Sequence, residues 1–426
     1  MLLALGLVAL ALVTPACGGG SDDDRSTAPA EIDGATATAA DGDTGADTAE
    51  RDPASGGGEP PSASAALGEV IGSGGDPIGV DLNPSGNRVV EGAAAFDEAE
   101  PIDVALDGTP LWVVPIDGEW VVVLDDGTAH LVTVDAAGAS TVTGIGSGPV
   151  DQPPLVVAGP DGPVVASVLE HPLLARFDDP LPDTRVVTAD GVAAALVGPT
   201  DRYPHGVLGD RLEAEAVQIV FLDEDRSITV GPDEPSVIEG ISPILADLDG
   251  DGRPEVIVTL SNGEVGAWLA AWNLDGELVG ESIAIGLGNR WRNQLAAAPT
   301  APDGSIELID VRTPHLGGTV EYFQLTDGEL VLTAGRAGFT SHRLGSRNLD
   351  EGIVVDGDGD GRLDVLVPTD DRLQLGLITR TGEDAEVVAL RDLDARLTTN
   401  VAAAADETGA VTIAAGFEGV LRLWRP

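Results

Sequence analysis

The sequence predicts an all-β domain that extends from about residue 67 to residue 426. Two observations favour this fold class. Short runs of Val, Ile and Leu alternate with turns rich in Gly, Asp, Pro and Asn, as in residues 111–134, 154–169 and 412–424. No long stretch repeats its apolar residues at the 3.6-residue period of an amphipathic helix. We therefore expect short strands and tight turns throughout this region.

A strand–turn–strand unit recurs along the domain. The central glycines of these units lie 43 to 57 residues apart, and they are Gly118, Gly162, Gly209, Gly252, Gly304, Gly361 and Gly409. Blades of four strands in β-propellers span about 40–50 residues. The spacing therefore predicts seven blades, and a closed ring of blades also removes exposed sheet edges. Two β-sandwiches are the competing architecture, against which the regular spacing argues.

Two of these turns are dense in carboxylates. Residues 244–258 read ILADLDGDGRPEVIV and residues 353–367 read IVVDGDGDGRLDVLV. Acidic side chains stand at loop positions 1, 3, 5 and 9, glycine stands at position 6, and the carbonyl of position 7 can point inward. Calcium takes about 6–8 oxygen ligands in tolerant geometry. The predicted ligands of two calcium ions are Asp247, Asp249, Asp251, Arg253 and Glu255, and Asp356, Asp358, Asp360, Arg362 and Asp364.

These loops are not EF-hands, because position 12 is Val258 or Val367 and the flanking residues favour strands. They resemble the FG-GAP/VCBS repeats of β-propeller proteins, including integrin-like propellers, in which D-x-D-x-D-G-x-x-[DE] joins the first two strands of a blade. The resemblance implies a seven-bladed β-propeller of four-stranded blades with calcium in two of them. The alternative for each loop is an acidic hairpin turn without metal, since Asp-Gly is by itself a common turn sequence.

The end of the chain provides too few residues for a complete last blade. Only two further strands fit after Gly409, and the second ends near Trp424. Another segment must then supply the fourth strand of that blade. Residues 76–91, which read PIGVDLNPSGNRVVEG, precede the first repeat. We therefore expect an N-terminal strand from this segment to close the ring.

The N-terminus predicts export. Residues 1–17 form a short apolar segment that ends at Cys17, the only cysteine, and resemble the signal segment of a bacterial lipoprotein. Residues 18–66 are rich in Gly, Ser, Ala, Pro and acidic residues, which predicts a disordered tether. We expect a protein lipid-anchored through Cys17 to the outer face of a bacterial cell membrane or cell envelope. A cleaved secretory signal without lipid is the alternative.

The charge balance excludes some partners. The chain carries 72 acidic residues against 22 basic ones, all of them arginine, for a net charge of −50. Such a surface does not bind nucleic acid in the usual way and disfavours anionic membranes. We therefore expect contact with the membrane only through the lipid anchor, and a monomer. A saline habitat would also account for this acidity.

Against this acidic background, basic and aromatic residues gather in four turns: 202–206, 288–294, 312–318 and 341–348. The resemblance implies that these turns meet on the face opposite the calcium loops, at the mouth of a central channel. The predicted ligand-binding residues are Tyr203, His205, Arg290, Trp291, Arg292, His315, His342 and Arg347. Arginine can bind carboxylate or phosphate with two parallel hydrogen bonds, and tryptophan offers a stacking surface. The alternative is that these side chains only satisfy neighbouring loops.

No sequence motif of a known catalytic class is present. We therefore expect a calcium-binding cell-envelope lipoprotein that serves as a non-catalytic binding or scaffold propeller for an extracellular protein or carbohydrate. The alternative is a propeller enzyme of hydrolase, lyase or dehydrogenase type. In that case His205, His315 and His342 would act as acid/base groups or metal ligands at the channel mouth.

Overall fold

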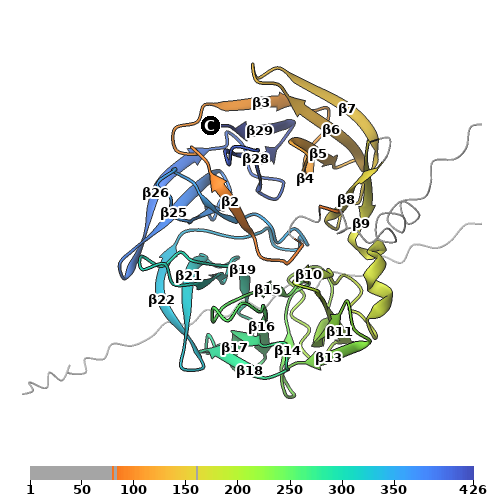
Figure 1. Cartoon of the computed structure of the whole chain (residues 1–426), viewed down its shortest axis with the longest axis vertical. Helices are drawn as coiled ribbons and strands as arrows, with labels where there is room; N and C mark the ends of the chain where they lie inside the picture. The colour runs from red at the N-terminus through yellow and green to blue at the C-terminus, as the bar shows by residue number, and fades with distance from the viewer. Residues whose placement is uncertain (1–78, 81–83, 160–161) are drawn as a thin grey trace, which may run out of the picture. The chain divides into compact units, whose positions relative to one another are not determined.

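The computed structural model describes residues 79–80, 84–159 and 162–426. The expected lipidation site Cys17, the tether of residues 18–66 and the start of the domain at residue 67 lie outside the described residues. The described chain is all-β, as expected, with two short 3₁₀ helices among the strands. Its largest sheet has 13 strands, and the main path of 11 strands curls round (Figure 1). Within the described part of the chain, the structure contains no helix that could span a membrane.

Two small sheets form the first part of the described chain. One is an antiparallel meander of β4 (Pro110–Ile116), β5 (Glu119–Leu124), β6 (Thr128–Val134) and β7 (Ser140–Ser147). The other contains β1 (Gly79–Val80), β8 (Pro154–Gly159) and β9 (Gly162–Ser167). The 3₁₀ helices η1 (Val168–Glu170) and η2 (Pro172–Arg176) follow β9. The expectation of four strands is therefore wrong for this unit, because the chain turns into helices after its second sequential strand.

The 13-stranded sheet contains three successive antiparallel meanders. The first comprises β10 (Val187–Ala189), β11 (Val192–Thr200), β12 (Glu213–Phe221) and β13 (Arg226–Val230). The second comprises β15 (Ile244–Ala246), β16 (Glu255–Asn262), β17 (Gly266–Trp272) and β18 (Leu278–Ser282). The third comprises β19 (Arg292–Ala298), β20 (Glu307–Arg312), β21 (Thr319–Thr326) and β22 (Glu329–Ala337). The short strand β14 (Val237–Ile238) joins the first two meanders, and parallel pairing of β18 with β22 joins the last two.

Two further sheets complete the fold. The five-stranded sheet contains β23 (Ile353–Asp356), β24 (Asp364–Pro368), β25 (Gln374–Thr381), β26 (Asp384–Asp392) and β2 (Val89–Ala93), which runs parallel to β23. The last sheet contains β27 (Ala402–Ala405), β28 (Val411–Phe417), β29 (Val420–Trp424) and β3 (Pro101–Ala105).

An N-terminal strand does supply the fourth strand of the last sheet, but it does not come from the expected residues. The strand is β3, in which Ile102 pairs with Leu423 and Val104 with Leu421. The prediction of residues 76–91 is wrong, since β1 pairs with β8 and β2 with β23. The physical reason is side-chain alternation: Val104 is buried with Leu421 and Leu423, while Asp103 on the other face pairs with Arg422.

Most of the expected turn glycines lie between the first two strands of a meander, but Gly209 does not. It lies in the long connection between β11 and β12. The tight turn of that meander is Asp190-Gly191, between β10 and β11, and both residues have positive φ (46° and 78°). Asp-Gly suits this turn because two positive φ values match the twist of a hairpin. Because the β11–β12 connection is long and contains Gly209, the repeat spacing pointed to Gly209 and not to Gly191.

Apolar side chains fill the space between sheets that follow one another in sequence. Val113 and Val122 of the β4–β7 sheet pack with Leu421 and Leu423 of the last sheet. Equivalent clusters connect the β15–β18 meander with β19–β22, β19–β22 with β23–β26, and β23–β26 with β27–β29. The core is therefore a series of inter-sheet layers, and the connecting turns lie at the ends of the strands.

His171 gives the fold a specific sensitivity to acid. Its Nδ1 atom accepts a hydrogen bond from the backbone N–H of Leu173 (3.2 Å) at the start of η2, and burial lowers its pKa to about 4. An unfolded histidine takes up a proton near pH 6.5. The unfolded chain therefore binds more protons between pH 6.5 and about 4, and stability falls as the pH falls through this window.

We expect His171→Asn to weaken this dependence, because asparagine also accepts a hydrogen bond at a helix start but does not titrate. Urea unfolding of both proteins at pH 7 and pH 5 measures the effect. The difference in unfolding free energy between the two pH values should be smaller for the variant. An unchanged difference would show that His171 does not contribute.

Candidate metal loops and a histidine cluster

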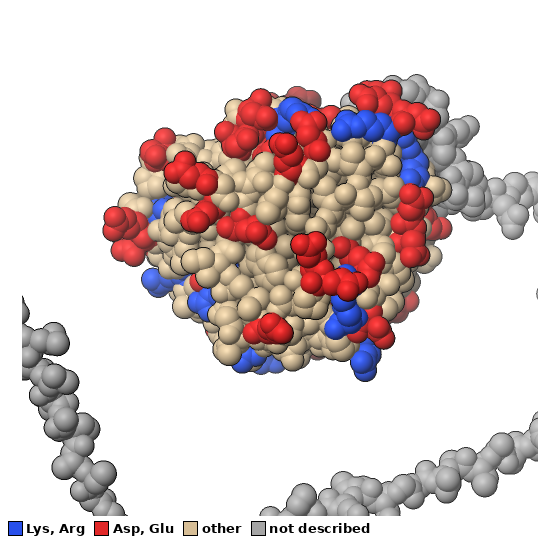
Figure 2. Space-filling view, turned by 90° about the horizontal axis from the view of Figure 1, so that it is seen from below, with Lys and Arg blue, Asp and Glu red and all other residues tan. Residues whose placement is uncertain are grey.

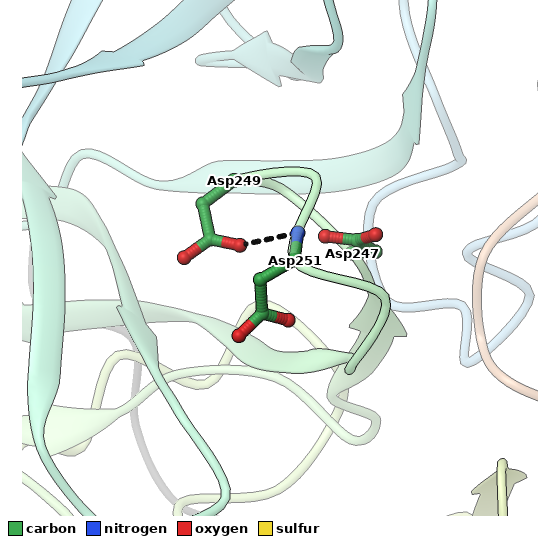
Figure 3. A group of neighbouring side chains, drawn as sticks. All are labelled: Asp247, Asp249 and Asp251. Carbon is green, nitrogen blue, oxygen red and sulfur yellow. Dashed lines mark hydrogen bonds between the residues drawn. The ribbon is translucent and has the colours of Figure 1, made fainter.

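Three aspartates converge in the turn between β15 and β16. One carboxylate oxygen each from Asp247, Asp249 and Asp251 lies within 4.8 Å of the others (Figure 3). Asp356, Asp358 and Asp360 form the same arrangement between β23 and β24. Within the described residues, these two aspartate triplets are the only groups of three or more acidic, histidine or cysteine side chains that meet this distance.

The two loops share one pattern of backbone hydrogen bonds. The carboxylate of Asp247 accepts from the N–H groups of Gly250 (2.7 Å) and Gly252 (3.0 Å). Asp356 accepts equivalently from Gly359 (2.8 Å) and Gly361 (3.0 Å). All four glycines have φ between 75° and 87°, which side chains rarely tolerate. The glycines at positions 4 and 6 therefore permit the wrap that brings the aspartates together.

The acidic residues at position 9 lie beneath the loops. Glu255 and Asp364 are each 1% exposed. Glu255 accepts a hydrogen bond from Leu248 N–H (2.7 Å), and Asp364 accepts one from Gly357 N–H (3.1 Å). Burial, reinforced by the nearby aspartates, raises the pKa of each carboxyl to about 7. Both therefore fix the start of the loop and lie outside the triplets themselves.

The residues at position 7 direct their side chains to neighbouring acids. Arg253 pairs with Asp275 (3.1 Å) and Arg362 with Asp360 (3.3 Å), and all four side chains are well exposed. The Arg253 guanidinium thus lies away from the first triplet, whereas the Arg362 guanidinium pairs with Asp360, a member of the second triplet. Only the carbonyl groups of the two arginines remain as expected ligands. Each loop offers an all-oxygen donor set, which suits a hard divalent cation and not a soft one.

A second group of functional side chains forms where the four basic and aromatic turns meet. The rings of His315 and His342 have centroids 4.4 Å apart, and Trp291 lies 4.9 Å from His342 and 6.3 Å from His315. The rings of Tyr203 and His205 lie 5.6 Å apart. The backbone N–H of Asn289 donates to the Tyr203 hydroxyl oxygen (3.1 Å), which links the first two turns.

Glu239 connects these side chains. Its Oε1 atom lies 2.5 Å from Nδ1 of His205, its Oε2 atom accepts a hydrogen bond from the Ser261 hydroxyl, and its backbone carbonyl accepts one from the Trp291 indole (3.4 Å). We define the histidine cluster as Tyr203, His205, Glu239, Trp291, His315 and His342. Sequence reasoning missed Glu239, although an isolated acid just before a first strand, in VIEGIS, was a usable signal.

Burial changes the pKa values of side chains in and near this cluster. It lowers the pKa of His315 to about 4 and that of His342 well below the usual histidine range. Both rings are therefore neutral near pH 7. Beside them, burial and the charge of Glu239 raise the pKa of Glu213 to about 10, so that this carboxyl holds a proton. Two imidazoles of the cluster, those of His315 and His342, are therefore neutral.

The predicted arginines have different environments. Arg292 is buried in β19 and pairs with Asp310 and Glu321, each at 2.8 Å. Arg347 pairs with Asp183 (2.8 Å) and Asp210 (2.6 Å). Arg290 is half-buried and donates to the carbonyl of Asn289 (3.0 Å). Arg292 thus belongs to the core and is not available at the surface.

Exposed leucines lie in or next to the turns that carry the histidine cluster. Leu287, Leu316 and Leu344 are 60%, 61% and 62% exposed. Arg343, next to Leu344, is also exposed. Acidic side chains dominate the charged residues of the chain, and on the face in Figure 2 the red acidic side chains cover more area than the blue arginines. These turns therefore differ in character from the general surface.

Comparison with known proteins adds little. No protein-family model matches the chain, and no curated protein matches it. Among solved structures, the chain is similar to "Structure of U3-55K" (TM-score 0.39, 8% identity, 76% of this chain and 98% of that one). It is also similar to the computationally designed Ika8 protein (TM-score 0.37, 11% identity, 79% and 100%). The class of protein rests on the fold and sites: an all-β protein with two aspartate triplets suited to metal.

Proposed function

We propose that the chain is a seven-bladed β-propeller that binds two calcium ions and serves as a non-catalytic binding or scaffold protein at the bacterial cell envelope. The propeller is supported by seven groups of strands that follow one another along the chain. Five groups contain four consecutive strands, and a sixth, β27–β29, gains its fourth strand from β3. The β4–β7 meander packs against the last sheet, and β3 pairs with β29 in that sheet. Both contacts support a closed ring.

The observation that carries the calcium proposal is the repetition of one loop geometry at two places. Both triplets use the same loop positions, the same two glycines and the same backbone hydrogen bonds. Three carboxylates held this close repel one another, and a divalent cation relieves the repulsion. Calcium fits better than magnesium because it accepts six to eight oxygens in irregular geometry, whereas magnesium demands an octahedron.

Calorimetric titration of the full chain with calcium and with magnesium tests this proposal. We expect about two calcium ions to bind per chain, more tightly than magnesium. Asp249→Asn and Asp358→Asn should each remove one of the two sites. Binding of calcium with unchanged stoichiometry in both variants would contradict the assignment of the loops.

The turns around the histidine cluster support the binding role. Leu287, Leu316, Leu344 and Arg343 place apolar area and a positive charge on an otherwise acidic chain. We propose that this surface binds an extracellular protein or a carbohydrate, with the chain held at the membrane by a lipid on Cys17. Clustered exposed apolar residues are typical of interaction sites.

Screening the purified chain against a glycan array and a panel of extracellular proteins tests this surface. A ligand found in the screen should lose affinity for the double variant Leu316→Ser and Leu344→Ser. Leu278→Ser, on β18 and 48% exposed, is the matched control and should bind normally. Equal loss in both variants would place the binding surface elsewhere.

One observation favours the alternative, an enzyme at the same place. Glu239 holds Nδ1 of His205, which leaves Nε2 as the free nitrogen, as in a histidine that acts as a general base. Turnover of a substrate that disappears in His205→Gln would favour the enzyme over the scaffold.

A further inference from the structure

The histidine cluster has a feature that a pure scaffold does not require. The Nε2 atoms of His315 and His342 are buried, and neither has a hydrogen-bond partner among the described residues. A buried polar atom without a partner costs about 1–3 kcal/mol. His342 is 1% exposed, so bulk solvent does not reach its ring freely. Two such nitrogens on adjacent rings indicate a ligand between or beside them.

The opposite nitrogens of two of the rings are occupied. Nδ1 of His205 bonds to Glu239 (2.5 Å), and Nδ1 of His342 lies 3.1 Å from the Ser341 hydroxyl. A partner at Nδ1 fixes the ring and leaves Nε2 as the nitrogen available for another ligand. A carboxylate behind a histidine also raises the basicity of the ring, which is the usual support of a metal-bound histidine.

We propose that His315, His342 and His205 bind one divalent transition-metal ion through their Nε2 atoms. Imidazole nitrogens suit zinc, copper, nickel and cobalt, and they do not suit calcium. This site goes beyond the proposed function and is chemically separate from the all-oxygen loops. Three histidines would leave one coordination position for water or for a donor atom of a ligand bound at the histidine cluster.

The rings must move to close on one ion. Among the described residues the three histidines are not a group whose nitrogens all lie within 4.8 Å of one another. His315 and His342 form the packed half of the site, since their rings lie together against Trp291. His205 lies on the 202–206 turn, its side chain is 14% exposed, and Glu239 holds its Nδ1 atom, so its approach requires a shift of that turn. Metal binding thus draws the 202–206 turn toward the other two.

Cobalt provides the direct test because tetrahedral Co²⁺ with nitrogen ligands absorbs visible light. The full chain is freed of metal with chelator, returned to buffer with excess calcium, and titrated with Co²⁺ and then Zn²⁺. We expect one equivalent of Co²⁺ to give a visible spectrum that Zn²⁺ abolishes. Metal analysis after dialysis should find one zinc per chain in addition to calcium.

Variants assign the ligands. His315→Gln and His342→Gln should each abolish the spectrum, and Glu239→Gln should weaken binding about 10–100-fold through His205. His130→Gln, on β6 and hydrogen-bonded to Thr128, is the matched control and should bind as the unchanged protein does. Circular dichroism and calcium titration of each variant show whether it is folded. If a histidine variant does not fold, the weaker Co²⁺ affinity of Glu239→Gln still tests the site.

Two results would overturn the proposal. One is a folded, calcium-binding chain that takes up no Co²⁺ or Zn²⁺ in this titration, in which case bound water satisfies the two Nε2 atoms. The other is Co²⁺ binding that survives both His315→Gln and His342→Gln. Either outcome would leave the calcium proposal unaffected. Conversely, Asp249→Asn and Asp358→Asn should lose calcium binding and still bind Co²⁺ at the histidines.

Discussion

Replacing Arg292 with methionine is expected to lower the free energy of unfolding by about 3–5 kcal/mol, the usual cost of removing one partner from a buried ion pair. The Arg292 guanidinium donates to Asp310 and Glu321, both at 2.8 Å, and the three side chains are at most 7% exposed. Without it, Asp310 loses its ion-pair partner in a buried place, and Glu321 keeps only Arg312 (2.6 Å). Chemical denaturation at pH 7 measures the loss.

Arg290→Met is the matched control for this experiment. Arg290 lies two residues earlier, is half-buried, and donates only to the carbonyl of Asn289. A substitution at such a position usually changes stability by less than about 0.5 kcal/mol. Equal effects of the two variants would contradict the assignment of Arg292 to the core. Binding of a ligand at the histidine cluster should be impaired by Arg292→Met only to the extent that the fold is lost.

Removing calcium is expected to cost the protein about 5 kcal/mol of stability when the ion is at a hundredfold excess over its dissociation constant. Each site bound only in the folded state contributes about 2.7 kcal/mol under that condition. Asp358→Asn should remove about half of this difference. Asparagine still accepts the hydrogen bond from Asp360 N–H (3.1 Å), so the loop keeps its backbone bond while it loses a charge.

Thermal melts of both proteins in excess calcium and in chelator measure this effect. The variant should melt lower than the unchanged protein in calcium, and no lower in chelator, where one fewer carboxylate reduces repulsion. Equal destabilisation in both conditions would mean that Asp358 only supports the loop. Asp303→Asn is the control: Asp303 accepts from Ser305 N–H (3.0 Å) in the β19–β20 turn, which has no triplet.

The strands were predictable because local sequence determines them. Short runs of Val, Ile and Leu predict strands, and the Asp and Gly residues between them predict turns, without knowledge of distant contacts. The aspartate triplets were predictable for the same reason, since Asp247, Gly250 and Gly252 interact within one loop. Their chemistry depends on a spacing of a few residues, which the sequence displays directly.

The sequence also led to the four turns that form the histidine cluster, but not to Glu239, which joins them. Glu239 bonds to residues 34 and 22 positions away, His205 and Ser261, and such pairings depend on how the sheets pack. Composition cannot distinguish Arg290 at the edge of the cluster from Arg292 in the core. Only the register of β19 decides which of the two side chains is buried beside Asp310.

By itself, then, the sequence determined the all-β class, most of the turns and the two carboxylate loops, because these follow from interactions between residues close together along the chain. The tertiary structure alone decided that β3 and not residues 76–91 completes the last sheet, that Gly191 and not Gly209 makes the turn after β10, and that Arg292 is structural. The choice of β3 and the burial of Arg292 depend on which strand edge or buried acid lies opposite, and that partner is distant along the chain. The Asp190-Gly191 turn is itself local, but the long β11–β12 connection places Gly209 outside it.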